Sequence, residues 1–365
     1  MRVPFNYLPY QFAETGKYFK AWKKLIKSSE FTLGPFVERF EKSFAKFIGV
    51  KHCISTNNGT DALILSLKSL GIKKGDEVIT VCNSFYATAG AIVACGAKPI
   101  FVDADKRYQI NVDKIQRAIT KKTKVILPVH WGGASPDMKK ILDISRKNNL
   151  KVIEDACMGI GAKIKSKSPG TFGKVNAMSM HPLKSLNVMG DGGIVVTNDD
   201  KIASWCKKYR NHGMIDRDHI QNWGVNMRLQ PLQAVVADIE LKKVRKIVKI
   251  RNKNANFLDK HLSTLKEVSL PERKKNYTET FALYMARFKK RDQLKSFLIK
   301  NGVEVKIHYP IPLHLQKASK NMGYKKGDFP EAENQSKDLL TLPVHQYLNK
   351  KQLNYTINTI KKFYK

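Results

Sequence analysis

Hydrophobic residues in the first two thirds of the chain gather in short, β-rich runs that alternate with amphipathic segments. The segment 61–70, for example, carries apolar residues at spacings that suit a helix packed against a sheet. This alternation predicts an α/β fold with a mostly parallel sheet covered by helices. The seven candidate strands are His52–Thr56, Glu77–Cys82, Pro99–Val102, Lys124–Pro128, Lys151–Glu154, Ala177–Met180 and Gly193–Thr197.

The pattern changes near residue 240. Lysine-rich helical segments follow, then a strand-like run at 281–288 and a helical tail. The total of 365 residues exceeds a typical single domain. We predict a large domain over 1–240, which includes the N-terminal segment, and a smaller α+β domain over 241–365. Neither a repeat nor a low-complexity linker separates the two, so we expect them to share an interface.

Apolar stretches along the chain are too short to cross a bilayer; the run 87–95 is among the longest. The first residues lack the basic-then-apolar build of a signal peptide. The five cysteines are odd in number, widely spread, and form no CxxC pair that would indicate zinc or a redox dithiol. We therefore expect a soluble cytoplasmic protein with reduced, buried thiols and no metal.

The charge balance is strongly basic, with 66 Lys and Arg against 31 Asp and Glu, a formal net charge of +35. Such an excess can indicate nucleic acid, an anionic membrane surface, or a lysine-rich solvated surface. The lysines occur as scattered pairs, such as Lys23-Lys24 and Lys139-Lys140, and aromatic residues do not interleave with them. We interpret them as a solvated surface that also attracts a small anionic substrate.

The segment 57–61, Asn-Asn-Gly-Thr-Asp, lies where a predicted strand ends and a helix begins. Gly59 permits a tight turn, and free N–H groups at a helix N-terminus bind anions. The Thr60 hydroxyl adds a further donor, so a phosphate site is one interpretation. An ordinary turn followed by a helix cap is the other.

Two further segments contain candidate chemistry. The run 152–157 is a hydrophobic strand that ends in Glu154 and Asp155. Ligands of open α/β sheets bind beyond the carboxyl ends of the strands, so Asp155 would face a metal, a water or a protonated ring nitrogen there. The alternative is an acid that caps a helix or forms an ion pair.

Lys184 is a lone lysine among uncharged neighbours, just before the glycine-rich turn 190–193. Desolvation would lower its pKa and make it an amine nucleophile toward a carbonyl.

Taken in order, the motifs of the chain resemble those of the DegT-type sugar aminotransferases, enzymes of pyridoxal 5′-phosphate (PLP) fold type I. The resemblance implies a large domain with a mostly parallel, seven-stranded sheet covered by helices, and a smaller C-terminal α+β domain. The matching segments are Val3–Phe5, Gly34-Pro35, Asn58–Leu63, Gly75–Ile79, Phe101–Asp103, Glu154-Asp155, Ser179–Lys184, Gly190–Gly193, Asn226–Arg228, His308–Pro310, Pro312–His314 and Leu342–His345.

The resemblance also implies roles for individual residues. Lys184 matches the lysine that holds PLP as a Schiff base and moves the proton during transfer. Asp155 matches the acid that keeps the pyridine nitrogen protonated, which makes the ring an electron sink. The remaining assignments are Gly59, Thr60 and Ser179 in a phosphate cup, Phe85 stacked on the ring, and Asn226 reaching the phosphate from the neighbouring subunit of a homodimer.

Several of these residues have simpler interpretations. Phe85 can be ordinary core packing, Ser179 and Asn226 ordinary caps, and His181 a residue that only shapes the turn before Pro182. The chain also departs from the family pattern. Asn58 replaces the serine of Ser-Gly-Thr, and Asp191 replaces the glutamate of Gly-Glu-Gly-Gly. Met158 stands where the family has glutamine, and it cannot form the amide's hydrogen bond near the phenolic oxygen of the cofactor.

The resemblance implies a transaminase that works in two half-reactions. An amino acid, expected to be glutamate, gives its nitrogen to PLP, and the resulting pyridoxamine phosphate (PMP) aminates a keto sugar, most simply a nucleotide-linked one, in amino-sugar or surface-polysaccharide biosynthesis. Arg228, His308 and Tyr309 are the expected substrate-binding residues.

Two other functions remain as alternatives. In PMP-dependent sugar dehydratases of the same superfamily a histidine replaces the lysine, and Lys184 argues against that activity. A PLP-fold regulator that binds nucleic acid is suggested by the charge of +35. No helix-turn-helix or zinc module accompanies the predicted fold, which disfavours this second alternative.

Overall fold

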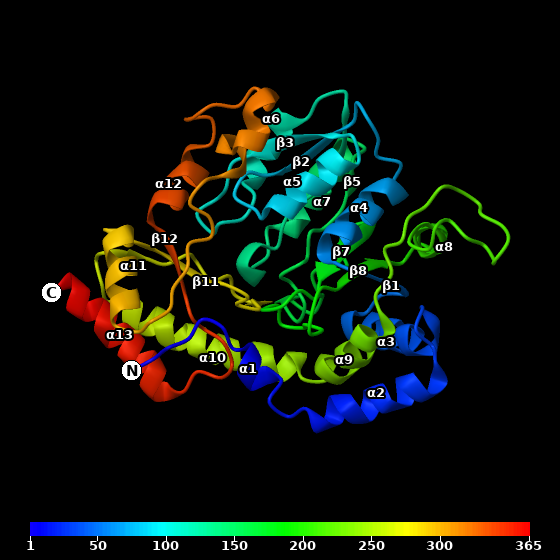
Figure 1. Cartoon of the computed structure of the whole chain (residues 1–365). Helices are drawn as coiled ribbons and strands as arrows, with labels where there is room; N and C mark the ends of the chain where they lie inside the picture. The colour runs from blue at the N-terminus through cyan, green and yellow to red at the C-terminus, as the bar shows by residue number, and fades with distance from the viewer.

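A mostly parallel sheet forms the centre of the larger part of the molecule in the computed structural model, which describes residues 1–365 (Figure 1). A four-stranded parallel sheet in the order β3-β2-β4-β5 and a three-stranded sheet in the order β1-β8-β7 are joined by parallel bridges from Val129 through Asp155 to Ala177. The expected seven-stranded arrangement is confirmed, with β8 antiparallel to both neighbours. The strands are β1 (His52–Thr56), β2 (Glu77–Val81), β3 (Lys98–Val102), β4 (Thr123–Ile126), β5 (Lys151–Val152), β7 (Val175–Ser179) and β8 (Gly193–Thr197).

The predicted strand boundaries agree closely with these bounds. The ranges of β1 and β8 are those predicted, whereas β5 ends two residues earlier than expected. The chain nevertheless stays extended beyond Val152, because the N–H of Ile153 donates to the carbonyl of Ile126 and the N–H of Asp155 to that of Pro128. Asp155 therefore sits at the carboxyl edge of the sheet, where the sequence pattern placed it.

Helices cover both faces of the sheet. Successive strand residues point to opposite faces, and in β7 Ala177 packs in the same hydrophobic cluster as Leu63, whereas Met178 packs with Phe40 on the other side. Strands buried on both faces are nearly continuous apolar runs, which is why the sequence reveals them. The covering helices are α3 (Gly34–Ile48), α4 (Gly59–Ser69), α5 (Tyr86–Ala94), α6 (Ile115–Ala118), α7 (Met138–Lys147), α8 (Asp200–Tyr209) and α9 (Pro231–Leu241).

A smaller antiparallel sheet and three long helices make up most of the C-terminal part. The order of this sheet is β12-β11-β9, and its hydrophobic cluster contains Ala255, Tyr284, Leu298 and Ile360. Val3 also belongs to this cluster and bridges Val303. The bounds are β9 (Val268–Ser269), β11 (Tyr284–Phe288), β12 (Leu339–Leu342), α10 (Val244–Leu262), α11 (Arg291–Lys300) and α13 (Lys350–Tyr364). The division into domains at residue 240 stays a prediction.

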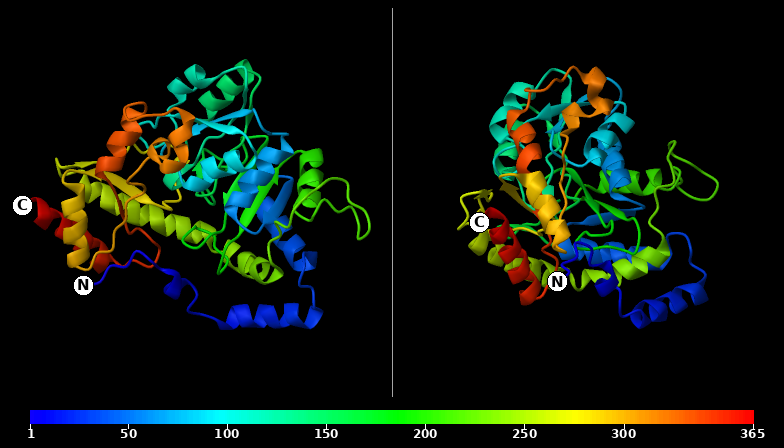
Figure 2. Two further views of the ribbon diagram at one scale, coloured as in Figure 1. Left: turned by 45° about the horizontal axis from the view of Figure 1, so that its top comes forward. Right: turned by 60° about the vertical axis from the view of Figure 1, so that its left-hand side comes forward.

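The remaining elements connect these two parts. Figure 2 shows α2 and the loop that follows α8 projecting from the main body. No helix of the chain is both long and apolar enough to span a bilayer. All five cysteines are free; four are buried and Cys157 is half-buried. The connecting elements are α1 (Leu8–Gln11), α2 (Gly16–Ser28), α12 (Pro330–Asp338), β6 (Lys163–Ile164), β10 (Tyr277–Thr278), and the short 3-10 turns Val112–Lys114, Trp131–Gly133, Leu313–Leu315 and Lys317–Met322.

Candidate active site

A cavity of about 240 Å³ opens at the carboxyl edge of the large sheet. Its wall includes the ends of β5 and β7, the start of α4, the loop around Lys184 and the segment 306–309. Of the residues singled out from the sequence, the cavity brings together Gly59, Thr60, Phe85, Asp155, Met158, Ser179, His181, Lys184, Asp191, His308 and Tyr309.

One end of the cavity is built to hold an anion. Helix α4 begins at Gly59, and the Asn58 side chain caps it by accepting the N–H of Asp61 at 2.8 Å. The N–H groups of Gly59 and Thr60 belong to the first turn, which has no intrahelical acceptors for them. A Cβ on Gly59 would lie 2.8 Å from the Cβ of Ser179 and 3.3 Å from the sulfur of Cys157. This close approach explains the glycine, and the arrangement fits the phosphate of PLP.

The two acids at the end of β5 have different environments because alternate strand residues point to opposite sides. The Glu154 carboxylate is fully buried and bonded to His130 Nε2 at 2.8 Å. It also accepts the N–H groups of Gly170, Phe172 and Gly173. Glu154 is therefore fully occupied in holding the loop 170–173.

Asp155, in contrast, lines the cavity and is 4% exposed. Its Oδ2 accepts the hydroxyl of Thr88 at 2.7 Å, and its Oδ1 accepts the N–H of Cys157 at 3.2 Å. Thr88 is hydrogen-bonded in turn to the hydroxyl of Ser84 at 2.6 Å. No cationic side chain lies within ion-pair distance of Asp155. A buried carboxylate without a cation, facing a cavity, suits the protonated ring nitrogen of PLP.

Lys184 faces the same cavity from the loop between β7 and β8. Burial lowers the pKa of its amine, and nearby Cys157 and Asp155 oppose that shift. Its carbonyl accepts the hydroxyl of Tyr7 at 3.1 Å. The preceding residue, Leu183, has φ 73°, in the left-handed region that a leucine rarely adopts. The amine that the sequence identified is thus desolvated and held at an irregular turn, as a nucleophilic lysine requires.

Aromatic side chains form one wall of the cavity. Phe85 immediately precedes α5 and is 46% exposed, so its ring does not belong to the hydrophobic core. Its ring centroid lies 6.1 Å from that of Tyr309, which lies 5.6 Å from that of Trp131. Next to them, burial and the charges of Lys306 and Lys184 lower the pKa of His308 to about 4. His308 is therefore neutral near pH 7.

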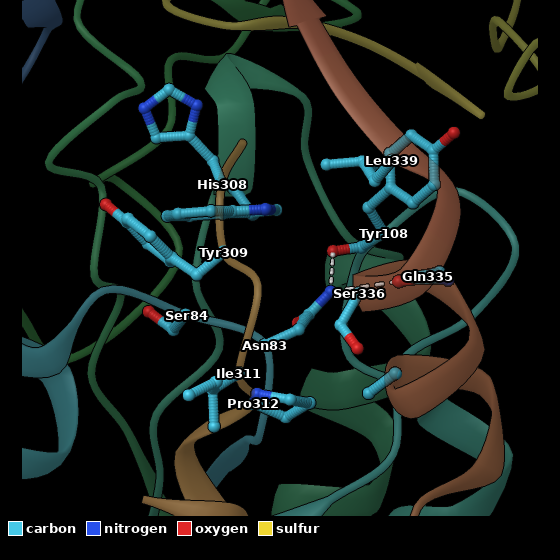
Figure 3. Close-up of a pocket in the computed structure, with 12 residues that line it drawn as sticks. Asn83, Ser84, Tyr108, His308, Tyr309, Ile311, Pro312, Gln335, Ser336 and Leu339 are labelled. Carbon is cyan, nitrogen blue, oxygen red and sulfur yellow. Dashed lines mark hydrogen bonds between the residues drawn. The ribbon is translucent and has the colours of Figure 1, made fainter. Parts of the chain in front are cut away.

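Figure 3 shows a smaller pocket of about 20 Å³ beside this wall. Asn83 lies in it, and its Nδ2 donates to the carbonyl of Tyr108 and to Gln335 Oε1. The pocket shares Ser84, Trp131, His308 and Tyr309 with the large cavity. The aromatic wall is thus a partition between the two spaces.

Two of the predicted residues, Asn226 and Arg228, do not line the cavity of their own chain. Asn226 is exposed, and its Oδ1 accepts the Nε–H of Arg228 at 3.0 Å. Both follow the projecting loop after α8, in which Trp223 is 87% exposed. Asn226 is expected to contact a neighbouring subunit and Arg228 to bind the substrate, and both roles stay predictions.

Sequence reasoning missed several cavity residues. Thr88 supports Asp155, Trp131 contributes to the aromatic wall, and Lys306 lines the cavity without an ion pair to any acid. Of these three residues, only Thr88 could have been found from the sequence, because it lies one helical turn after Phe85 at the start of α5 and so on the same side of the helix. Trp131 and Lys306 come from segments that only the tertiary fold places here.

Comparisons with known proteins agree with this geometry. Residues 13–361 match the model of the DegT/DnrJ/EryC1/StrS aminotransferase family. The crystal structure of S. venezuelae DesV in complex with a ketimine intermediate is similar with a TM-score of 0.96 and 32% identity, over 99% of this chain and 98% of that one. Two curated relatives are each 36% identical. One is a UDP-N-acetyl-3-dehydro-alpha-D-glucosamine 3-aminotransferase of Acidithiobacillus ferrooxidans, with 90% of this chain and 89% of that protein covered. The other is a pleiotropic regulatory protein of Geobacillus stearothermophilus, with 100% and 99% covered. The family expected from the motifs is confirmed: this chain belongs to the DegT/DnrJ/EryC1/StrS aminotransferase family.

Proposed function

We propose that this chain is a PLP-dependent aminotransferase that transfers an amino group from glutamate to a nucleotide-linked keto sugar in amino-sugar biosynthesis. The observation that carries the proposal is that one cavity contains three groups. They are the desolvated amine of Lys184, the buried carboxylate of Asp155, which has no cationic partner, and the anion cradle at Gly59. These are the three groups that PLP requires of a protein. The free cysteines are in keeping with a reducing compartment, and we propose a cytoplasmic location.

When bound, PLP supplies an electron sink for the negative charge that develops as a proton leaves the substrate carbon. The chain's own residues do the rest. Gly59, Thr60 and Ser179 would hold the phosphate, and Phe85 would stack on the ring. Asp155, whose Oδ2 accepts the Thr88 hydroxyl, would accept the N–H of the ring nitrogen. Lys184 would hold the cofactor covalently, and its amine, once the amino substrate has displaced it, would carry the proton, as general acid–base catalysis requires.

A cation and two polar side chains line the cavity at the segment 306–309. Lys306 has no acidic partner, and its ammonium lies 5.1 Å from the ring centroid of Phe5. Neutral His308 and the hydroxyl of Tyr309 add hydrogen-bonding groups beside it. A diphosphate or a donor carboxylate is the anionic group that such a wall binds. The Acidithiobacillus relative is named for a UDP-linked sugar, which supports a nucleotide-linked substrate here.

We also propose that two copies form a homodimer with shared active sites. The projecting loop exposes Ile215, Ile220 and Trp223, apolar residues that a partner would cover. A second copy would bring Asn226 to the phosphate cradle and Arg228 to the substrate. Mixing Lys184→Ala and Asn226→Leu subunits tests this. A mixed dimer regains one intact site, and so activity, only if Asn226 acts on the neighbouring subunit.

The activity itself is tested with PLP-reconstituted protein, L-glutamate and a panel of UDP- and dTDP-linked keto sugars. We expect 2-oxoglutarate and an aminated sugar in equal amounts, detected by mass spectrometry, and neither product with Lys184→Ala. Turnover by Lys184→Ala would overturn the proposal. Loss of a sugar hydroxyl without amination would favour the dehydratase, and salt-dependent DNA retention without transamination the regulator.

A further inference from the structure

The main chain at Lys184 is held by a residue from the N-terminal segment. The hydroxyl of Tyr7 donates to the carbonyl of Lys184 at 3.1 Å across 177 residues of sequence. Tyr7 is 3% exposed, and its ring is packed against those of His345 and Tyr347, with centroid distances of 5.4 and 6.2 Å. The position of this hydroxyl is therefore fixed by the packing around it.

Behind Tyr7 lies a buried cation without a counter-ion. Arg251 of α10 is 1% exposed and forms no ion pair with any acid. Its Nη2 donates to the Tyr7 oxygen at 2.8 Å, its Nε donates to Gln346 Oε1 at 3.0 Å, and its guanidinium carbon lies 5.1 Å from the Tyr7 ring centroid. A buried charge is costly unless hydrogen bonds satisfy it. Arg251 depends on two neutral acceptors and one aromatic ring.

This arrangement strengthens the bond to Lys184. An oxygen that accepts a hydrogen bond from a cation becomes a better donor, because each bond polarises the next. The series from Gln346 through Arg251 and Tyr7 ends on the Lys184 carbonyl, directly after Leu183 in its left-handed conformation. Strained turns of this kind persist only when their surroundings restrain them.

We propose that Tyr7 and Arg251 are positioning residues that fix the Lys184 main chain, so that its amine faces the cofactor cavity. The inference deepens the proposed function and rests on it. Neither residue bonds to the Lys184 amine; both act through the carbonyl of that residue. The N-terminal segment and α10 thereby form part of the active-site machinery.

The test compares Tyr7→Phe with Tyr355→Phe. Tyr355 provides a matched control, because its hydroxyl also donates to a main-chain carbonyl, that of Asn301 at 2.9 Å, away from the cavity. The apoproteins are mixed with PLP alone, and the dissociation constant and the rate of covalent attachment are followed by absorbance. Because a hydrogen bond contributes about 0.5–1.5 kcal/mol, we expect Tyr7→Phe to bind PLP about 2- to 12-fold more weakly and to attach it more slowly. Tyr355→Phe should match the wild type in both.

Melting temperatures separate positioning from a general loss of stability. The inference predicts that Arg251→Lys, which keeps the charge but loses the forked geometry, also slows PLP attachment. Equal PLP affinity and attachment rate in Tyr7→Phe and Tyr355→Phe would overturn the inference, even if both variants were destabilised. A wild-type protein that fails to attach PLP at all would instead refute the proposed function, so the two failures are distinguishable.

Discussion

Adding one methyl group to the anion cradle tests the cofactor site without removing any functional group. In Gly59→Ala the new Cβ would lie 2.8 Å from the Cβ of Ser179, 3.1 Å from its Oγ and 3.3 Å from the sulfur of Cys157. The first distance falls about 0.6 Å short of the 3.4 Å at which ordinary contact begins. The φ of Gly59 is not in the left-handed region, so the effect is steric and not a backbone strain.

The size of the effect follows from these contacts. Overpacking lowers the free energy of unfolding by about 1–3 kcal/mol. Replacing glycine by alanine in a helix raises it by about 0.5–1 kcal/mol. We expect the free energy of unfolding to fall by about 1–2 kcal/mol. Displacing Ser179 would also remove the hydrogen bond that we propose it forms with the charged phosphate, worth about 1.5–3 kcal/mol, so PLP affinity should fall by about 10- to 100-fold.

PLP binding is measured by absorbance titration of the apoprotein, and stability by urea unfolding. Gly90→Ala is the control: Gly90 lies in α5, away from the cavity, and a Cβ there meets no atom within 4 Å. It should leave PLP affinity unchanged and raise stability by about 0.5–1 kcal/mol. If Gly59→Ala binds PLP as tightly as Gly90→Ala, the phosphate does not occupy this cradle and the reasoning fails.

Three other predictions follow from the structure. Thr88→Val removes the hydroxyl that donates to Asp155 at 2.7 Å, a hydrogen bond worth about 1.5–3 kcal/mol. The variant should slow the glutamate half-reaction by about 10- to 100-fold in single-turnover experiments. An unchanged rate would show that Thr88 does not support the acid. Lys306→Met should raise KM for the nucleotide sugar about 3- to 10-fold and weaken the salt dependence of that KM, because an exposed cation contributes an attraction that salt screens. The control Lys300→Met, in α11, should change neither quantity. Burial lowers the pKa of both His308 and His345 to about 4, so between pH 6.5 and 4 the unfolded chain binds protons that the folded chain excludes. The free energy of unfolding should therefore fall as the pH drops through this range. In urea unfolding, His345→Gln should lose less stability over the same range than the wild type, and an equal loss would contradict this assignment.

Much of the large domain is predictable because its strands are buried on both faces. The apolar run 194–196 predicts β8 with its observed bounds, and β1 also has the predicted bounds although its sequence is more mixed. The antiparallel direction of β8 is not visible in the sequence, since hydrophobic content is the same for either direction. The end of β5 was placed too late, because the residues after Val152 keep strand-like hydrogen bonds without forming a full ladder.

The candidate site is predictable where a residue contrasts with its neighbours. Lys184 is a single lysine in an uncharged segment of a lysine-rich chain, and Asp155 ends an apolar strand. The contacts of Tyr7 are not visible in the sequence, because Lys184 lies 177 residues and Arg251 244 residues away, and the Lys184 contact is with a main-chain carbonyl. Met158 lines the cavity as expected, and its carbonyl accepts the Thr280 hydroxyl at 2.7 Å, so its backbone position is fixed although its side chain differs from the family's glutamine.

The central claim is that Lys184 is the residue that bonds to PLP. The most direct measurement is reduction of the PLP-reconstituted protein with borohydride, which makes the lysine–cofactor bond permanent, followed by peptide mass mapping. We predict one pyridoxyl group per chain, on Lys184, and none on Lys306, the other lysine that lines the cavity. A label on Lys306 or on surface lysines, with Lys184 unmodified, would contradict the account.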